Sequence, residues 1–252
     1  MDANDKRKWL VRKVLELGGL AAGTVLVAFG IAALVMGADG YSTVQSNLRQ
    51  EYIVGSPDMT PAGIAEGVAQ VKAAQQKIAA AQEKAGIPAG DRLEFTPVST
   101  PSCSVAGKAV TSGDRARCFA SYMRVHALES TNGLVYSQMG RFLAKPGAPI
   151  EFTDFNGGTS DPKYALADPK TGQPVSNPTR NLWVTETSLS SALNLSYTAE
   201  KISIFGIVVG AALLLSGLGF VILAVVAFHR RATAPVKEKQ ARLIPAPGGP
   251  LE

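Results

Sequence analysis

The sequence predicts a mainly α-helical fold in which two transmembrane helices form an antiparallel hairpin that extends into a mostly helical extracytoplasmic domain with a long irregular loop. Two observations predict it. First, the 252-residue chain contains two apolar runs without a charged residue, at 17–38 and 202–228, and about 20 apolar residues are enough to cross a bilayer as a helix. Second, between these runs the apolar residues recur mainly at the three- and four-residue spacing of helices.

The charged residues predict how the chain is oriented. The net charge of +5 divides into +2 before residue 17, zero over 39–201 and +3 after residue 228. Basic residues beside a transmembrane helix favour the cytoplasmic side of the membrane. We therefore expect 1–16 to be a basic cytoplasmic tail, 39–201 the extracytoplasmic domain and 229–252 a disordered cytoplasmic tail. The tail charges are Lys6, Arg7, Lys8, Arg12, Lys13, Arg230, Arg231, Lys237, Lys239 and Arg242 against Asp2, Asp5, Glu16, Glu238 and Glu252.

The distribution of charge along the chain also indicates which partners to expect. A net charge of +5 invites a nucleic-acid interpretation, but the domain between the runs holds as many acidic as basic residues. We therefore expect no nucleic-acid partner. The expected partners are the lipid bilayer and either a protein partner or a second copy of the chain.

The first apolar run is predicted to stay attached as a signal-anchor. It is longer than the roughly 7–15 apolar residues of a signal-peptide core, and its best cleavage position has Met36 where a small residue is needed. Cleavage would leave a single C-terminal anchor and the same outside domain. Tyr41, Val44 and Leu48 then follow at helical spacing, which predicts that the helix continues beyond the membrane as a stalk, with Gly40 as its weak point.

Glycines in both runs predict a close helix–helix contact. Small residues at helical spacing, as in Gly-xxx-Gly, let two backbones approach in a membrane. The contact is expected between the two runs, and a seam between copies of the chain is the alternative. The glycines expected to pack are Gly19, Gly23, Gly30 and Gly37 in the first run and Gly206, Gly210 and Gly217 in the second.

A helix over 62–85 is the clearest soluble element. Thr60 suits its N-cap and Pro61 its first position, and Gly86 ends it. Its apolar stripe is thin and is interrupted by Gln75, which favours a helix packed on its own domain by one narrow face; a coiled-coil or partner-binding helix is the alternative. The stripe is Ile64, Val68, Val71, Ile78 and Ala85.

The rest of the outside domain is predicted from spacing and from turn residues. A short strand or extended piece is expected over 92–101 and a loop over 103–112. A helix is expected from Asp114 to the Asn132-Gly133 pair, followed by a short helical piece before Pro146; a hairpin at Asn132-Gly133 is the alternative. Six prolines predict an irregular loop over 145–178, and helical spacing returns at Asn181 and continues into the second span.

Two cysteines and two histidines limit the possible chemistry. Cys103 and Cys118 both lie in the outside segment, where a disulfide is the simplest prediction; a metal pair or a redox dithiol is the alternative. His126 and Glu129 are three residues apart and therefore share a helix face, but a metal site needs at least a third ligand. No catalytic or phosphate-binding motif occurs, so we expect no catalytic residue, no cofactor and no metal.

Three stretches of the chain resemble a known family. These stretches, 51–59, 120–136 and 180–194, together with the apolar runs, are similar to small actinobacterial membrane proteins with two spans and an outside domain, many of them automatically named "aromatic ring-opening dioxygenase". The resemblance implies a location in the bacterial plasma membrane. The dioxygenase name implies an iron site with two histidine ligands, and since the outside segment has only His126, we reject that name.

Three hypotheses about function follow. The first is a non-enzymatic integral inner-membrane protein that acts as a structural or accessory subunit of a cell-envelope complex. Its motivation is a rigid helical hairpin that carries an outside domain large enough to bind a protein partner but without a set of catalytic residues. The second is a ligand-sensing or ligand-binding membrane protein. The short cytoplasmic tails argue against it, because they could not hold an output domain. The third is an extracytoplasmic enzyme that uses only Ser, Thr, Asp or Glu side chains, which no motif brings into order.

Overall fold

The computed structural model describes residues 3–232, and it is mainly helical, as predicted. The chain forms two compact units. We call the first the helix-pair unit, described over 3–39 and 203–232, and the second the globular unit, residues 40–202. The C-terminal tail, predicted to be cytoplasmic and disordered, lies outside the described residues from 233 onward.

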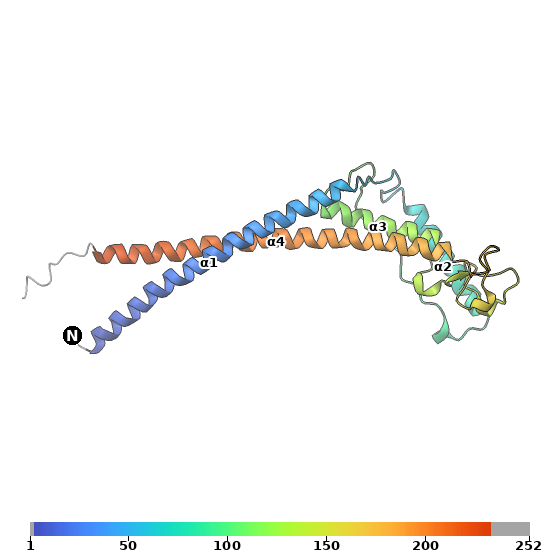
Figure 1. The fold of residues 1–252 in the computed structure, drawn as a ribbon, viewed down its shortest axis with the longest axis horizontal. Helices are drawn as coiled ribbons and strands as arrows, with labels where there is room; N and C mark the ends of the chain where they lie inside the picture. Colours follow the sequence, from blue (N-terminus) through green and yellow to red (C-terminus); the bar gives the residue numbers. More distant parts are fainter. Residues whose placement is uncertain (1–2, 233–252) are drawn as a thin grey trace, which may run out of the picture. The chain divides into compact units, whose positions relative to one another are not determined.

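Two long helices contribute to both units (Figure 1). Helix α1 spans Ala3–Gln50 and helix α4 spans Pro178–Ala232. Both are long and apolar enough to cross a membrane, which agrees with the two predicted runs. Helix α1 continues past Gly40, so the predicted stalk is helical without a break at its weak point. Residues 229–232, predicted as the start of a disordered tail, still belong to α4.

In the helix-pair unit, α1 and α4 run in opposite directions and meet through small residues. A Cβ atom added to Gly30 would lie 2.6 Å from the Leu214 nitrogen and 2.9 Å from the Gly210 oxygen. Contacts of the same kind join Gly23 to Gly217, and Gly37 to Ser203. The contacting positions of each helix are therefore seven residues apart. They are residues 23, 30 and 37 of α1 and residues 203, 210 and 217 of α4.

This seven-residue spacing corrects the Gly-xxx-Gly interpretation. A Cβ atom on Gly19 would meet nothing within 4 Å, so Gly19 does not take part in the contact. Gly206 reaches only ordinary van der Waals distance, 3.7 Å from the Cα of Gly37. A seven-residue repeat keeps one face of a helix turned toward its partner along a left-handed crossing, whereas Gly-xxx-Gly is typical of right-handed ones.

Helix α2, Ala65–Lys84, begins later than the sequence predicts. The Thr60 hydroxyl accepts a hydrogen bond from the Gly63 nitrogen at 2.9 Å, but it caps a turn that precedes the helix. Gly63 packs against the backbone of Asp58, where a Cβ atom would lie 2.6 Å from the Asp58 oxygen. Because this turn uses the first residues of the predicted helix, regular α-helix starts only at Ala65. The helix stops before Gly86, which has a φ of 69°.

The narrow face of α2 packs on the rest of the globular unit. Gln75, which interrupts the apolar stripe in the sequence, is buried, and its Nε2 donates to the Gly133 oxygen at 3.2 Å. Gln82 is also buried, and its Oε1 accepts from the Leu93 nitrogen at 2.7 Å. The stripe is therefore continuous, with two glutamines that satisfy loop backbone. Its buried members are Val68, Val71, Gln75, Ile78 and Gln82.

Helix α3, Gly113–Ser130, agrees closely with the prediction. It ends at Thr131, and Asn132 and Gly133 have φ values of 51° and 81°, so the pair forms a left-handed helix end. The alternative hairpin at this pair is wrong. Helix α3 packs along the N-terminal part of α4 (Figure 1), and the Ser190 hydroxyl of α4 donates to the Ala120 oxygen at 3.2 Å.

The segments predicted as loop and strand differ most from the structure. Residues 92–101 form neither a helix nor a strand. The only helical turn in the piece before Pro146 is the 3-10 helix η2, Tyr136–Gln138, and it leads into a strand. That strand, β1 (Phe142–Leu143), pairs antiparallel with β2 (Gly158–Thr159). The remaining 3-10 helices are η1 (Ala89–Asp91), η3 (Ile150–Phe152) and η4 (Pro162–Tyr164).

The segment 145–178 is thus more regular than its prolines predict. Isolated bridges join Ala144 to Ala165 and Phe142 to Ser176, so the segment folds back on itself around β1. Its last residues start α4, because the Asn177 Oδ1 accepts from the Thr179 nitrogen at 3.1 Å and Pro178 suits a first helical position. Helix α4 therefore starts slightly before the predicted Asn181.

Candidate functional site

The main polar cluster of the globular unit joins a loop to two helices. Asp58 lies in the loop before α2, His126 on α3 and Glu186 on α4. The Nε2 of His126 lies 2.9 Å from the Oδ2 of Asp58, although the two residues are 68 positions apart. The Ser56 hydroxyl donates to the Oδ1 of the same carboxylate at 2.5 Å. Both Asp58 oxygens therefore have a partner from another side chain.

The two carboxylates near His126 have opposite electrostatics. The hydrogen bond from the Ser56 hydroxyl has the largest effect and lowers the pKa of Asp58 below its ordinary value of 3.8. Burial opposes it as the next largest effect, and the charge and hydrogen bond of His126 lower the pKa further. Burial raises the pKa of Glu186 above its ordinary value of 4.5, and the charge of His126 opposes this. The Oε2 of Glu186 is buried without a hydrogen-bond partner. His126 thus stands beside one carboxylate that the fold stabilises as an anion and one that it does not.

This cluster is not arranged for nucleophilic catalysis. A serine nucleophile needs a base that accepts its proton, but Ser56 donates to Asp58 and not to His126. The Glu129 carboxylate, predicted to share a helix face with His126, packs against Gly67 of α2. Within residues 3–232, no group of three or more His, Cys, Asp or Glu side chains has the arrangement of a metal site.

The structure places Cys103 and Cys118 as a disulfide. Their sulfurs are 2.07 Å apart and their Cα atoms 6.0 Å apart. The bond joins the loop before α3 to the helix itself. The Tyr122 hydroxyl donates to the Cys103 oxygen at 2.5 Å, and Tyr122 is fully buried. Sequence reasoning missed Tyr122, although its position four residues after Cys118 puts both side chains on one helix face.

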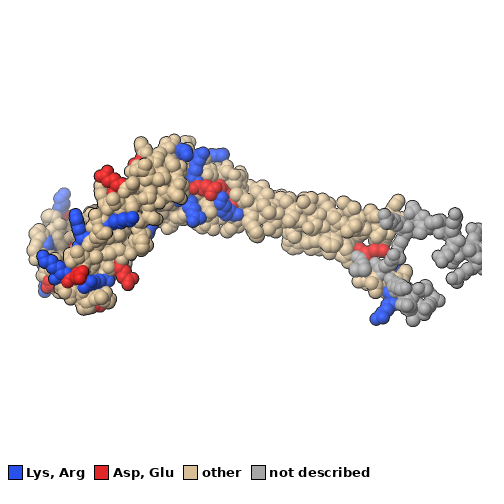
Figure 2. All heavy atoms as spheres, turned by 180° about the vertical axis from the view of Figure 1, so that it is seen from behind, with Lys and Arg blue, Asp and Glu red and all other residues tan. Residues whose placement is uncertain are grey.

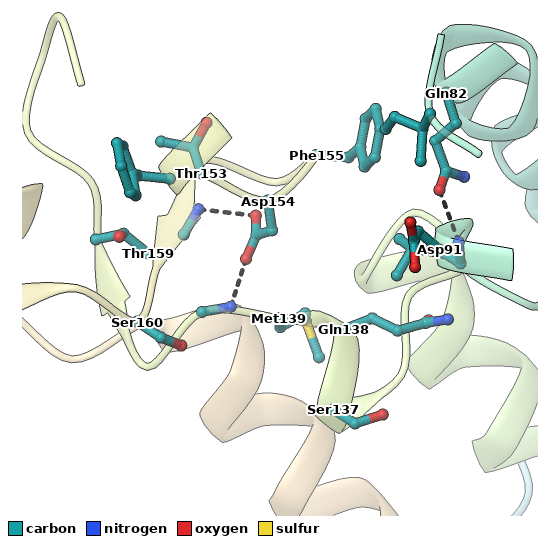
Figure 3. Close-up of a pocket in the computed structure, with 15 residues that line it drawn as sticks. Gln82, Asp91, Ser137, Gln138, Met139, Thr153, Asp154, Phe155, Thr159 and Ser160 are labelled. Atoms are coloured by element: carbon teal, nitrogen blue, oxygen red, sulfur yellow. Dashed lines mark hydrogen bonds between the residues drawn. The ribbon is translucent and has the colours of Figure 1, made fainter. Parts of the chain in front are cut away.

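Asp154 holds the loop between β1 and β2 in place. Its Oδ2 accepts from the Gly140 nitrogen at 2.5 Å, and its Oδ1 accepts from the nitrogens of Asn156 at 2.7 Å and Gly158 at 2.8 Å. Figure 3 shows the carboxylate between two of these amides. Asp161 and Asp168 likewise accept from backbone amides of their own turns. These three aspartates therefore organise loops and do not converge on a cation.

Open clefts surround this loop. One, of about 320 Å³, lies between Asp91, Gln138 and the loop at 152–160 (Figure 3). A second, of about 640 Å³, lies between the C-terminal end of α2 and the 150–155 segment. The side chains of Ile150, Phe152 and Phe155 are exposed at their edges. Neither cleft contains His126, Asp58 or Glu186, so the titratable cluster and these two clefts are separate features.

No protein-family model, curated protein or solved structure matches the chain. The fold therefore defines the protein only by class. It is a mainly helical protein with two helices long and apolar enough to span a membrane and a globular unit closed by a disulfide. Membership of the actinobacterial two-span family stays a prediction.

Proposed function

We propose that the chain is a non-enzymatic integral protein of a bacterial plasma membrane and that it serves as a structural or accessory subunit of a cell-envelope complex. In this proposal α1 and α4 form a transmembrane hairpin. The globular unit lies outside the cytoplasm, and both termini lie inside.

The observation that carries the proposal is the exposed apolar surface of the helix pair. In the most apolar part of each long helix, only 11% of the residues are buried inside the protein. Figure 2 shows the middle of this pair as a stretch of surface without acidic or basic side chains on the face drawn, with charged side chains only toward its ends. Exposing apolar surface to water costs about 25 cal/mol of free energy per Å². An apolar patch that runs along two helices of this length is larger than the patches that monomeric soluble proteins expose. A bilayer removes that cost.

Two further observations support the orientation. Basic residues outnumber acidic ones before residue 17 and after residue 228, as cytoplasmic flanks do. The Cys103–Cys118 pair stands at disulfide distance, and disulfides persist in compartments outside the reducing cytoplasm.

A role in assembly is supported by the surface of the globular unit. Its polar clusters are used internally, since Asp58, Asp154 and Gln82 each bond another part of the same unit. Large apolar side chains are left on the outside, notably Tyr52 at 88% and Ile150 at 85% exposed. Ile150, Phe152 and Phe155 expose apolar surface within one short segment, and apolar patches with aromatic side chains are typical of protein–protein contacts.

Two experiments test the proposal. Alkaline phosphatase fused after residue 170 should be active, and fused after residue 252 inactive, with green fluorescent protein giving the reverse pattern; an active phosphatase at residue 252 would contradict the orientation. For the assembly role, the full chain is purified from native membranes in mild detergent. We expect a stoichiometric partner that an Ile150→Asp or a Tyr52→Asp variant loses. A chain that always elutes alone would contradict it.

A further inference from the structure

We propose that the cleft beside Tyr197 binds the phosphate of an anionic lipid headgroup at the outer face of the membrane. This inference rests on the orientation in the proposed function. The cleft has a volume of about 570 Å³ and lies wholly in the globular unit. Its walls are the segment 99–103, the first turns of α3 and the Tyr197 ring on α4.

Arg117 is the cation that faces this cleft. Its guanidinium carbon lies 4.6 Å from the centre of the Tyr197 ring, so the planar group is held against an aromatic face. The cleft also contains Asp114, but Lys201 lies 3.0 Å from that carboxylate and balances its charge. No carboxylate of the described chain pairs with Arg117 itself. Arg117 therefore keeps its donors for a ligand, and a guanidinium matches phosphate geometry well.

Hydroxyl groups complete the donor set. Ser99, Thr100 and Ser102 line the cleft on the side opposite the helix. Across residues 3–232, these three side chains have no hydrogen-bond partner. A cation with several neutral hydroxyl donors suits a phosphate, whose oxygens accept several hydrogen bonds at once.

The position along α4 identifies the source of the phosphate as a lipid. Tyr197 precedes Ile202, where the apolar run begins, by five residues, which is about 8 Å along a helix. Tyrosine and arginine at that height are typical of the headgroup layer. Each basic side chain near an anionic membrane surface adds about 1 kcal/mol of attraction.

The chain supplies a matched control. Arg124, one heptad further along α3, lies over the Trp183 ring at 5.7 Å, so it repeats the stacked arrangement of Arg117. Trp183 precedes Ile202 by 19 residues, which is about 28 Å along α4. That distance takes Arg124 beyond the headgroup layer. Arg117 and Arg124 therefore differ mainly in height above the apolar run.

The test measures lipid bound to the full chain. The protein is delipidated in detergent, phosphatidylglycerol is added, and bound lipid is counted by native mass spectrometry. We expect Arg117→Gln to weaken binding about fivefold and Arg124→Gln to leave it unchanged. A Ser99→Ala/Ser102→Ala double variant, altered only on an exposed segment, should also weaken binding. Melting curves of each variant check that it is folded.

Three outcomes would overturn the inference: equal binding by Arg117→Gln and the unaltered chain, equal loss in Arg117→Gln and Arg124→Gln, or displacement of the lipid by millimolar inorganic phosphate. The last would assign the site to free phosphate. Failure of the proposed orientation is seen separately, because it changes the reporter fusions, whereas failure of this site leaves them as they are.

Discussion

Asp58 is the residue whose chemistry was least predictable from the sequence. Helical spacing paired His126 with Glu129, because a pattern within one helix reports only neighbours on that helix. The actual partner of His126 comes from a loop 68 residues away, and only the tertiary fold brings it there. The acid–base character of this cluster was therefore not predictable from the sequence, whereas the choice of His126 as the notable histidine was.

An Asp58→Asn variant should lose stability at neutral pH, by less than about 1 kcal/mol because the Asp58 side chain is 45% exposed. The folded chain lowers the pKa of Asp58 below 3.8, so the contribution is complete above that value and disappears as the pH falls through the folded pKa. The difference in melting temperature between the variant and the unaltered chain should shrink from pH 6 to pH 3. Asp91→Asn, on the exposed η1 turn, is the control. A difference independent of pH would contradict a lowered pKa of Asp58.

Glu186 should behave in the opposite way. Burial raises its pKa above 4.5, so the folded state favours its neutral form. The stability associated with that form is present below the ordinary pKa and is lost as the pH rises through the folded one. A Glu186→Gln variant should therefore melt slightly higher at pH 7, within about 3 °C, and no higher at pH 4. A lower melting temperature at pH 7 would show that the charged Glu186 supports the fold.

At the scale of elements, helices were predicted well and short pairings were not. Helices α3 and α4 agree with their predicted ranges to within a few residues. Long segments with helical periodicity and clear end signals are the elements that a sequence predicts most reliably. The two-residue strands β1 and β2 are too short to show any alternation. Their pairing depends on Asp154 and Asn177, which hold backbone amides and a carbonyl of the same small sheet region.

The disulfide gives the first prediction about elements. Replacing Cys103 and Cys118 together by serine should cost about 3 kcal/mol, the chain-entropy value for a loop of this length, and lower the melting temperature by roughly 6 to 12 °C. The fluorescence of Trp183, which is buried in the globular unit, follows the transition. Labelling of either thiol by maleimide before any reduction would show that the bond does not form.

The glycine contact between α1 and α4 gives the second prediction about elements. In Gly30→Leu, the new side chain would meet the Leu214 backbone of the partner helix, and crowding of this kind costs about 1–3 kcal/mol. Gly19→Leu puts the same residue on the same helix where nothing lies within 4 Å. We expect only Gly30→Leu to lower the midpoint of thermal aggregation in detergent. Equal effects of the two would place the contact elsewhere.

For the molecule as a whole, composition carried more information than any motif. The two apolar runs and the distribution of charge defined the long helices before any contact was known. The Gly-xxx-Gly interpretation was wrong in its spacing, because glycines four and seven residues apart occur together in both runs. Whether the glycines four apart or those seven apart form the contact depends on how the two helices cross, and the crossing is determined by the partner helix.

The seven-residue register of this contact also limits how the chain can change in length. One residue inserted between Gly30 and Gly37 would turn everything beyond it by about 100° around the helix axis, and the glycines on the two sides of the insertion would no longer face one partner. Seven residues added to α1 alone would restore the face but leave the added turns without matching glycines on α4. The helix pair should therefore accept many substitutions on its outward side, and lengthen or shorten only when both helices change together by a whole heptad.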